Sequence, residues 1–131
     1  MIYKEISYEE YCDLQDTTGA YLVLYPNGDK SWYIHEERHR KDGPAVEEAN
    51  GTKYWYLHGK LHREDGPAVE WDDGTKEWWV HGLRHREDGP AIERADGTKA
   101  WWIRGIRYQT KKEWEIALDE LRAKEIKEMI V

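Results

Sequence analysis

The amino-acid sequence predicts a mainly β protein: an antiparallel meander or solenoid of about four 23-residue β-hairpin repeats, between a short and a longer helix. Two observations carry this prediction. The segments 39–61, 62–84 and 85–107 align without gaps, and 16–38 is a weaker copy. Each repeat also contains an Asn-Gly or Asp-Gly step, the strongest short hairpin signal in a sequence.

Two tight turns in each repeat predict how the strands pair. If positions 50–51 form a two-residue turn, Val46 pairs with Trp55. A second tight turn at positions 59–60 then pairs Tyr56 with Arg63. Because both connections are short, each repeat is expected to add two antiparallel strands.

Side chains alternate along a strand, so this pairing predicts two faces. The first Trp of each repeat and its apolar neighbours form the predicted core: Trp32, Trp55, Trp78, Trp101, Ile34, Leu57, Val80, Ile103, Val23, Val46, Val69 and Ile92. The other face carries the second aromatic residue of each repeat. There the second turn is expected to set Arg40, Arg63 and Arg86 opposite the first three rings, a good arrangement for cation–π contacts, and Gln109 opposite the fourth.

Comparison among the repeats predicts where a ligand binds. Positions that are identical in every repeat solve the same packing problem, whereas positions that differ are free to contact a partner. Two columns break the pattern: Tyr25, Glu48, Trp71, Arg94, and Ser31, Tyr54, Glu77, Ala100. The predicted binding residues combine the aromatic row with the Arg residues and one exceptional Trp: Tyr33, Tyr56, Trp79, Trp102, Arg40, Arg63, Arg86, Arg104 and Trp71. The alternative is that these rings only form the second side of a sheet wrapped on itself.

The two ends of the chain differ from the repeats. Capping boxes predict a helix near 8–15, from Ser7 with Glu10, and a helix over about 111–129, from Thr110 with Glu113. The chain is interpreted as one domain, with an N-terminal cap (1–15), hairpin repeats (16–108) and a C-terminal helix (109–131). The helices are expected to cover the terminal strands; binding a partner or a second copy is the alternative.

The pattern W-x-x-x-G-x-x-H-R-x-D-G-P-A, which runs from Trp55 to Ala68 and from Trp78 to Ala91, resembles MORN-type repeats. It is more similar to the HRxDGPA variant common in uncharacterised bacteriophage and large-virus proteins. The resemblance covers about residues 20–108, with Asp-Gly-Pro-Ala in place of the usual Gly-x-Gly end. It implies interaction rather than catalysis, and it makes a phage-type inhibitor of a host defence protein a plausible function.

One segment imitates a zinc-protease motif. Residues 35–39 spell HExxH, but that motif binds zinc only on a helix, and the repeat alignment places it at a β-turn. The row of Glu47, Glu70 and Glu93 is interpreted as solvated rim charge. We therefore expect no enzyme, no catalytic residue, no metal ligand and no cofactor.

The composition limits the classes of molecule that the protein is expected to bind. The chain has 131 residues, a net charge of -7, eight Trp and nine Tyr but no Phe. Net negative charge disfavours duplex DNA. The single Cys12, with no transmembrane run or signal peptide, predicts the cytoplasm, or the host cytoplasm if the protein is viral. A protein partner is expected first; a nucleotide or signalling small molecule, or single-stranded nucleic acid, is the alternative. Self-association through the C-terminal helix or a sheet edge is also possible.

Overall fold

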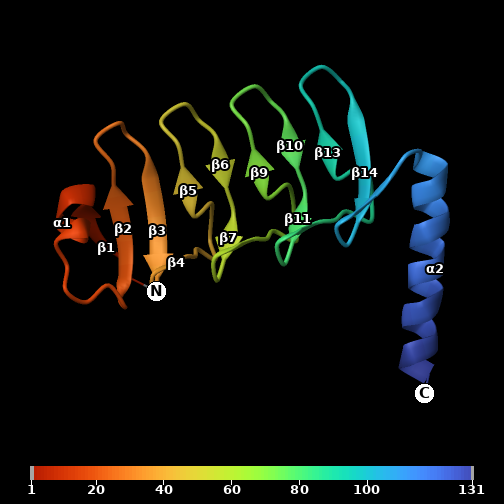
Figure 1. Ribbon diagram of the computed structural model, residues 1–131, viewed down its shortest axis with the longest axis horizontal. Helices are drawn as coiled ribbons and strands as arrows, with labels where there is room; N and C mark the ends of the chain where they lie inside the picture. The colour runs from red at the N-terminus through yellow and green to blue at the C-terminus, as the bar shows by residue number, and fades with distance from the viewer. Residues whose placement is uncertain (1, 131) are drawn as a thin grey trace.

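The structure is a computed structural model that describes residues 2–130. A long open β-sheet runs between a short N-terminal helix and a longer C-terminal helix, and its hairpins stand side by side (Figure 1). The predicted fold class is confirmed. Within residues 2–130, neither helix combines the length and apolar character that crossing a bilayer requires.

The main sheet follows the order of the chain. Its strands are β1 (Lys4–Ser7), β2 (Ala20–Leu24), β3 (Lys30–Ile34), β5 (Val46–Glu47), β6 (Lys53–Tyr54), β9 (Val69–Glu70), β10 (Lys76–Glu77), β13 (Ile92–Glu93), β14 (Lys99–Ile103) and β15 (Ile106–Tyr108), with β4 (Glu37–Arg38) paired to β3. Two separate hairpins join β7 (Tyr56–Leu57) to β8 (Lys60–Leu61), and β11 (Trp79–Val80) to β12 (Leu83–Arg84). The pairings are antiparallel except that β1 lies parallel to β2, which the sequence did not predict.

The first turn of each repeat is longer than predicted. Val46 pairs with Tyr54, not with Trp55, because the loop holds three residues and ends on Gly51 with φ +97°. The N–H of Gly51 donates to the carbonyl of Glu48, the usual geometry of a type I turn followed by a bulge. A shift of one residue moves a side chain to the opposite face. The predicted core is therefore wrong in placing Trp55 and its equivalents beside Val46.

The second turn lies one residue earlier than predicted. His58 and Gly59 both have positive φ, 48° and 77°, as a type I′ turn requires. Tyr56 consequently pairs with Leu61, and the predicted pairing of Tyr56 with Arg63 is wrong.

Buried side chains form a thin core along the sheet. They include Val23, Val46, Val69, Ile92, Ala45, Ala68 and Ala91. Helix α2 (Lys111–Ile130) packs Trp114 and Leu118 against Ile103, so it covers the C-terminal end of the repeats as predicted. Helix α1 (Tyr8–Cys12) begins at the predicted Ser7 capping box but ends earlier than position 15.

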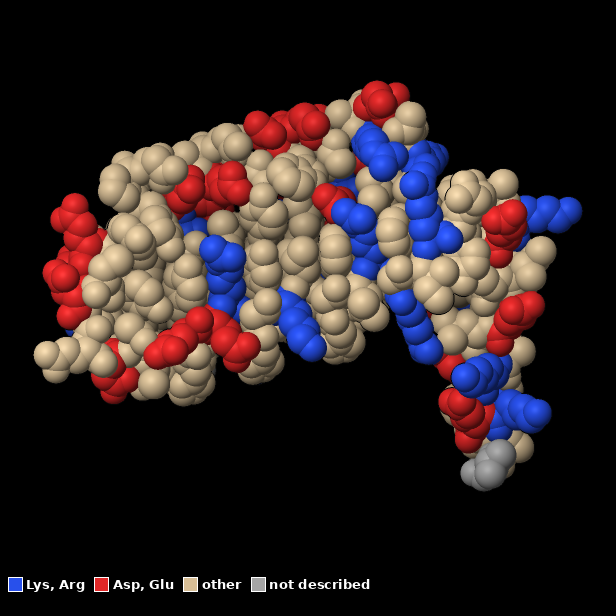
Figure 2. Space-filling model, in the orientation of Figure 1, with Lys and Arg blue, Asp and Glu red and all other residues tan. Residues whose placement is uncertain are grey.

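Charge is distributed unevenly along the sheet. In the view of Figure 2, Asp and Glu are prominent around α1, whereas Lys and Arg gather over the opposite end, near β13, β14 and α2. The strands between carry both signs. The two ends of the molecule therefore offer different chemistry to a partner.

Candidate functional site

One face of the sheet carries the same contact three times. Arg63 lies over the ring of Trp55, with Cζ 4.0 Å from the ring centroid. The contact joins adjacent repeats, because the Arg comes from the start of the next repeat. Its equivalents are Arg40 over Trp32 at 3.9 Å and Arg86 over Trp78 at 3.7 Å. We call this surface the Arg–Trp face, after Arg40, Arg63, Arg86, Trp32, Trp55 and Trp78.

The Asp-Gly-Pro-Ala loop holds each Arg in place. Arg63 donates from Nε to Asp65 at 3.1 Å and from Nη1 to the carbonyl of Pro67 at 3.0 Å. A Cβ on Gly66 would lie 2.9 Å from the guanidinium carbon. Glycine therefore leaves room for a guanidinium that is held between the loop and the indole ring.

The other identical residues also link hairpins to one another. Nδ1 of His62 accepts the N–H of His81 at 2.9 Å, and Oγ1 of Thr52 accepts the N–H of Asp72 at 3.2 Å. His62 is buried, and its Nδ1 must be unprotonated to accept this bond. The recurring His and Thr residues are thus explained by the stacking of repeats.

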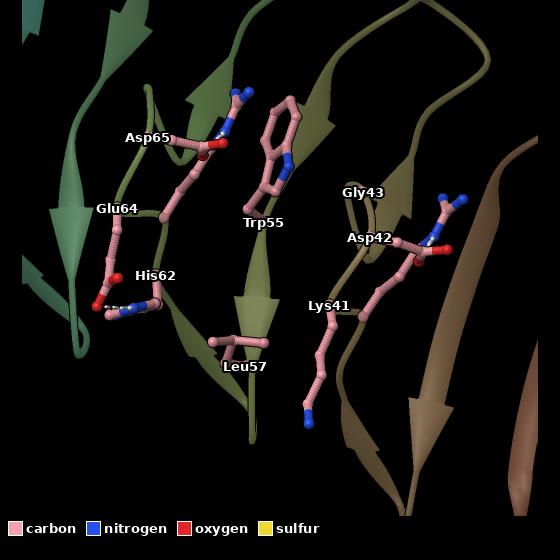
Figure 3. A pocket seen from close by; sticks show the side chains of 10 residues that line it. Lys41, Asp42, Gly43, Trp55, Leu57, His62, Glu64 and Asp65 are labelled. Carbon is pink, nitrogen blue, oxygen red and sulfur yellow. Dashed lines mark hydrogen bonds and ion pairs between the residues drawn. The ribbon is translucent and has the colours of Figure 1, made fainter. Parts of the chain in front are cut away.

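Three grooves separate the loops of the Arg–Trp face. Figure 3 shows the first, of about 730 Å³, between the loop at 40–43 and the loop at 62–65 with Trp55 between them. The second and third measure about 690 and 630 Å³. In the third, α2 forms the far wall, and Trp114 packs on Trp101 at 4.8 Å between ring centroids. Helix α2 thus stands where a fifth repeat would supply its Arg.

The opposite face gathers the two columns that break the repeat pattern, together with the aromatic row and the residues paired with it. We call it the variable face; its members are Tyr25, Ser31, Tyr33 and Arg38 in repeat one, Glu48, Tyr54, Tyr56 and Leu61 in repeat two, Trp71, Glu77, Trp79 and Arg84 in repeat three, and Arg94, Ala100, Trp102 and Arg107 in repeat four. The one-residue shifts in the turns bring both pattern-breaking columns beside the predicted aromatic row. Each repeat therefore presents its own cluster of four side chains.

The cluster of repeat three is organised around a buried carboxylate. Glu77 is 8% exposed and accepts from Nε1 of Trp71 at 2.7 Å and from Nε1 of Trp79 at 3.2 Å. Arg84 pairs with the same carboxylate at 3.2 Å. Its Cζ lies 4.9 Å from the Trp79 ring and 5.1 Å from the Trp102 ring, so the guanidinium bridges repeats three and four.

In the first two clusters, tyrosine hydroxyls are the main polar groups. The hydroxyls of Tyr25 and Tyr33 lie 3.1 Å apart. Burial, followed by a hydrogen bond to Glu48, raises the pKa of Tyr54 to about 12, so this phenol stays neutral. In repeat one, Tyr11 of α1 stacks on Tyr33 at 5.4 Å. The open part of the variable face therefore begins at repeat two.

The structure separates the predicted binding residues. Tyr33, Tyr56, Trp79, Trp102 and Trp71 share the variable face, as their repeat positions require. The predicted Arg40, Arg63 and Arg86 instead lie on the Arg–Trp face, and Arg104 sits in a turn and pairs with Glu125 of α2. The residues that sequence reasoning missed are Arg38, Arg84 and Arg107, which pair with the aromatic row once the second turn is placed correctly.

The HExxH segment is a turn, as predicted. His35 and Glu36 have φ of 49° and 68°, which no helix contains, and the buried His39 accepts the N–H of His58 through Nδ1. Across residues 2–130, no three His, Cys, Asp or Glu side chains are grouped to hold a metal ion.

Comparison of the chain with models of known families, with curated proteins and with solved structures finds no match in any of the three. The resemblance to MORN-type repeats therefore stays a prediction. The site has to be interpreted from its own geometry.

Proposed function

We propose that this is a non-catalytic binding protein whose variable face binds a partner protein. The observation that supports this most is the division of labour between faces. The residues that recur identically on the Arg–Trp face are engaged in contacts that join the hairpins. The two columns that break the repeat pattern are collected on the variable face, where they are not needed to build every repeat alike.

The chemistry of the variable face suits a protein interface. Trp, Tyr and Arg are the residue types enriched at interface hot spots, and repeats two to four offer all three. Trp71 is 39% exposed although its indole N–H is held by Glu77. A ring held in place before binding loses less side-chain entropy on binding, which favours affinity.

The same proposal includes the biological setting. Cys12 is an exposed free thiol, which suits a reducing compartment, so we place the protein in the cytoplasm, or in a host cytoplasm if it is viral. Its resemblance to repeats in phage and large-virus proteins supports a role as an inhibitor of a host defence protein. The partner would then be a host protein that covers repeats two to four.

Paired variants test the proposal. Wild-type protein is used for affinity capture from a host lysate, beside Trp79→Ala on the variable face and Lys41→Ala on the rim of the first groove. Trp79→Ala is expected to weaken binding of the captured protein by about 30-fold, the loss typical of a hot-spot residue. Lys41→Ala should bind like wild type. Both variants should still unfold cooperatively, and Trp79→Ala should lose far more in binding than in stability.

Two results would contradict the proposal. Equal binding by Trp79→Ala would remove the variable face from the interface. Saturable quenching of Trp fluorescence by ATP or by an oligothymidylate, again lost in Trp79→Ala, would assign the face to nucleotides or single strands, which stack on aromatic rings.

A further inference from the structure

The four clusters of the variable face differ in one respect: whether hydrogen-bond donors have an acceptor. Repeat one contains the Tyr25–Tyr33 hydroxyl pair, and in repeat two Glu48 is the carboxylate that, after burial, raises the pKa of Tyr54. Repeat three has Glu77 as the acceptor of its two indoles and its Arg. Repeat four carries donors at three of its four positions, Arg94, Trp102 and Arg107, and no carboxylate among them; Arg94 donates to Oγ1 of Thr98 at 3.4 Å.

Repeat three is an internal template for repeat four. The template places Trp71, Trp79 and Arg84 around the carboxylate of Glu77. One repeat later, the same positions hold Arg94, Trp102 and Arg107, and the position of Glu77 holds Ala100. The donors are kept or made more basic, whereas the carboxylate is removed.

The indole of Trp102 shows the consequence. Its Nε1 is buried, and no acceptor in residues 2–130 meets it, whereas the equivalent Nε1 of Trp79 donates to Glu77. A buried N–H without an acceptor has lost its hydrogen bonds to water and gained none in the protein, which is unfavourable. This donor would gain from an acceptor brought by another molecule, which reaches it once the side chains that cover it move aside.

The surrounding charge favours an anion. Arg94 and Arg107 are exposed, and neither forms an ion pair with a carboxylate of the described residues. Arg84 lies 5.1 Å from the Trp102 ring. Arg84 and Arg94 line one surface groove of about 300 Å³, where Glu77 already pairs with Arg84 and Asp73 is the other carboxylate. Lys and Arg gather over this end of the sheet in Figure 2, although the chain as a whole is acidic.

We propose that the repeat-four cluster of Arg94, Ala100, Trp102 and Arg107 binds a carboxylate from outside the chain, in the place that Glu77 occupies in repeat three. A carboxylate has two coplanar oxygens, which suit the fork of an arginine and leave a lone pair for the indole N–H. Its source is either an Asp or Glu side chain of the partner or a small free carboxylate. The inference rests on the proposed function only in using the same face.

The indole N–H provides a direct readout. In two-dimensional 1H–15N spectra the Trp102 indole signal is assigned by its loss in Trp102→Phe. Acetyl-Glu-amide, acetate and acetyl-Gln-amide are then added at constant ionic strength. The two carboxylates are expected to shift the Trp102 signal saturably, and acetyl-Gln-amide is not. Tighter binding of acetyl-Glu-amide than of acetate, by about 10-fold or more, assigns the site to a protein side chain; equal binding assigns it to small carboxylates.

A substitution supplies the carboxylate from within. In Ala100→Glu the Trp102 signal should move without ligand, and added acetyl-Glu-amide should shift it no further. Ala100→Gln is the control of equal size. If Ala100→Glu does not fold, the exposed pair Arg94→Gln with Arg107→Gln replaces it and should weaken acetyl-Glu-amide binding at least 10-fold. The inference is overturned if the shift of the Trp102 signal does not saturate with added carboxylate, or if acetyl-Gln-amide produces an equal shift.

The two proposals fail separately. If capture of the partner is lost in Trp79→Ala but unchanged in Ala100→Glu, the proposed function is retained. The same result contradicts the binding of a partner carboxylate at repeat four. Saturable binding of acetyl-Glu-amide, with capture unaffected by Trp79→Ala, keeps the carboxylate site and contradicts the protein interface.

Discussion

The two faces of the sheet use similar residue types for different purposes. On the Arg–Trp face, Arg63 is held by Trp55, Asp65 and the carbonyl of Pro67, and its equivalents repeat the arrangement. On the variable face, Arg84 bridges two Trp rings and pairs with Glu77, and no other repeat has this arrangement. Contacts that every repeat must make become uniform. Residues that are not needed for the contacts between repeats can differ from one repeat to the next.

The largest effect is expected from Arg63→Ala. The change leaves the Pro67 carbonyl and Asp65 without their donor and uncovers one side of Trp55. We expect a loss of about 2–3 kcal/mol in the free energy of unfolding, measured by urea denaturation. The matched control on the variable face is Arg107→Ala, an exposed residue for which a change within about 0.5 kcal/mol is expected. Similar losses in the two variants would break the contrast between the faces.

The role of glycine in the loop is tested with the same Arg. Gly66→Ala places a Cβ against the guanidinium of Arg63 and should cost about 1–2 kcal/mol. In the double variant with Arg63→Ala the clash disappears. The loss of stability in the double variant should therefore be smaller than the sum of the losses in the two single variants. Strictly additive losses would show that Gly66 serves the backbone rather than the Arg.

A smaller effect is expected at the first turns. Thr52 is 1% exposed, and Thr52→Val removes the acceptor of the Asp72 N–H. A loss of about 1 kcal/mol is expected in thermal or urea unfolding. Thr98→Val is the control, because Thr98 holds the same position in repeat four and its hydroxyl bonds only within its own repeat. If Thr98→Val costs as much, the Thr hydroxyls act inside their turns and not between repeats.

The smallest effect is a pH dependence on the Arg–Trp side. Burial, then the neighbouring His58 and Lys41, lowers the pKa of His39, whose Nδ1 accepts the N–H of His58. As the pH falls, His39 is protonated in the unfolded chain before it is protonated in the folded protein. Stability is therefore complete above about pH 6.5 and decreases below it. Replacing His39 with Asn, which keeps an acceptor, should flatten the unfolding profile between pH 7 and 5. A profile that keeps its full slope in this variant would remove His39 as its cause.

Much of the fold followed from local patterns. The gapless repeat and the Gly-containing turns predicted hairpins, and Thr110 with Glu113 predicted the helix over Lys111–Ile130. The parallel pairing of Lys4–Ser7 with β2 was missed because it is decided by contacts distant in sequence. The end of α1 at Cys12 was also missed. The variable columns were recognised, but not their shared face.

The repeat, the presence of two turns in each copy and the positions at which the copies differ all followed from the amino-acid sequence. The face that each position occupies depends on the strand register, which is set by contacts in the folded chain. The reason is that Asn-Gly and Asp-Gly steps fit a two-residue or a three-residue loop, and a non-glycine residue such as His58 was not expected at positive φ. In a strand, a shift of one residue exchanges the faces. It therefore separated Arg63 from Tyr56, and it brought Arg84 to Trp79 and Arg107 to Trp102.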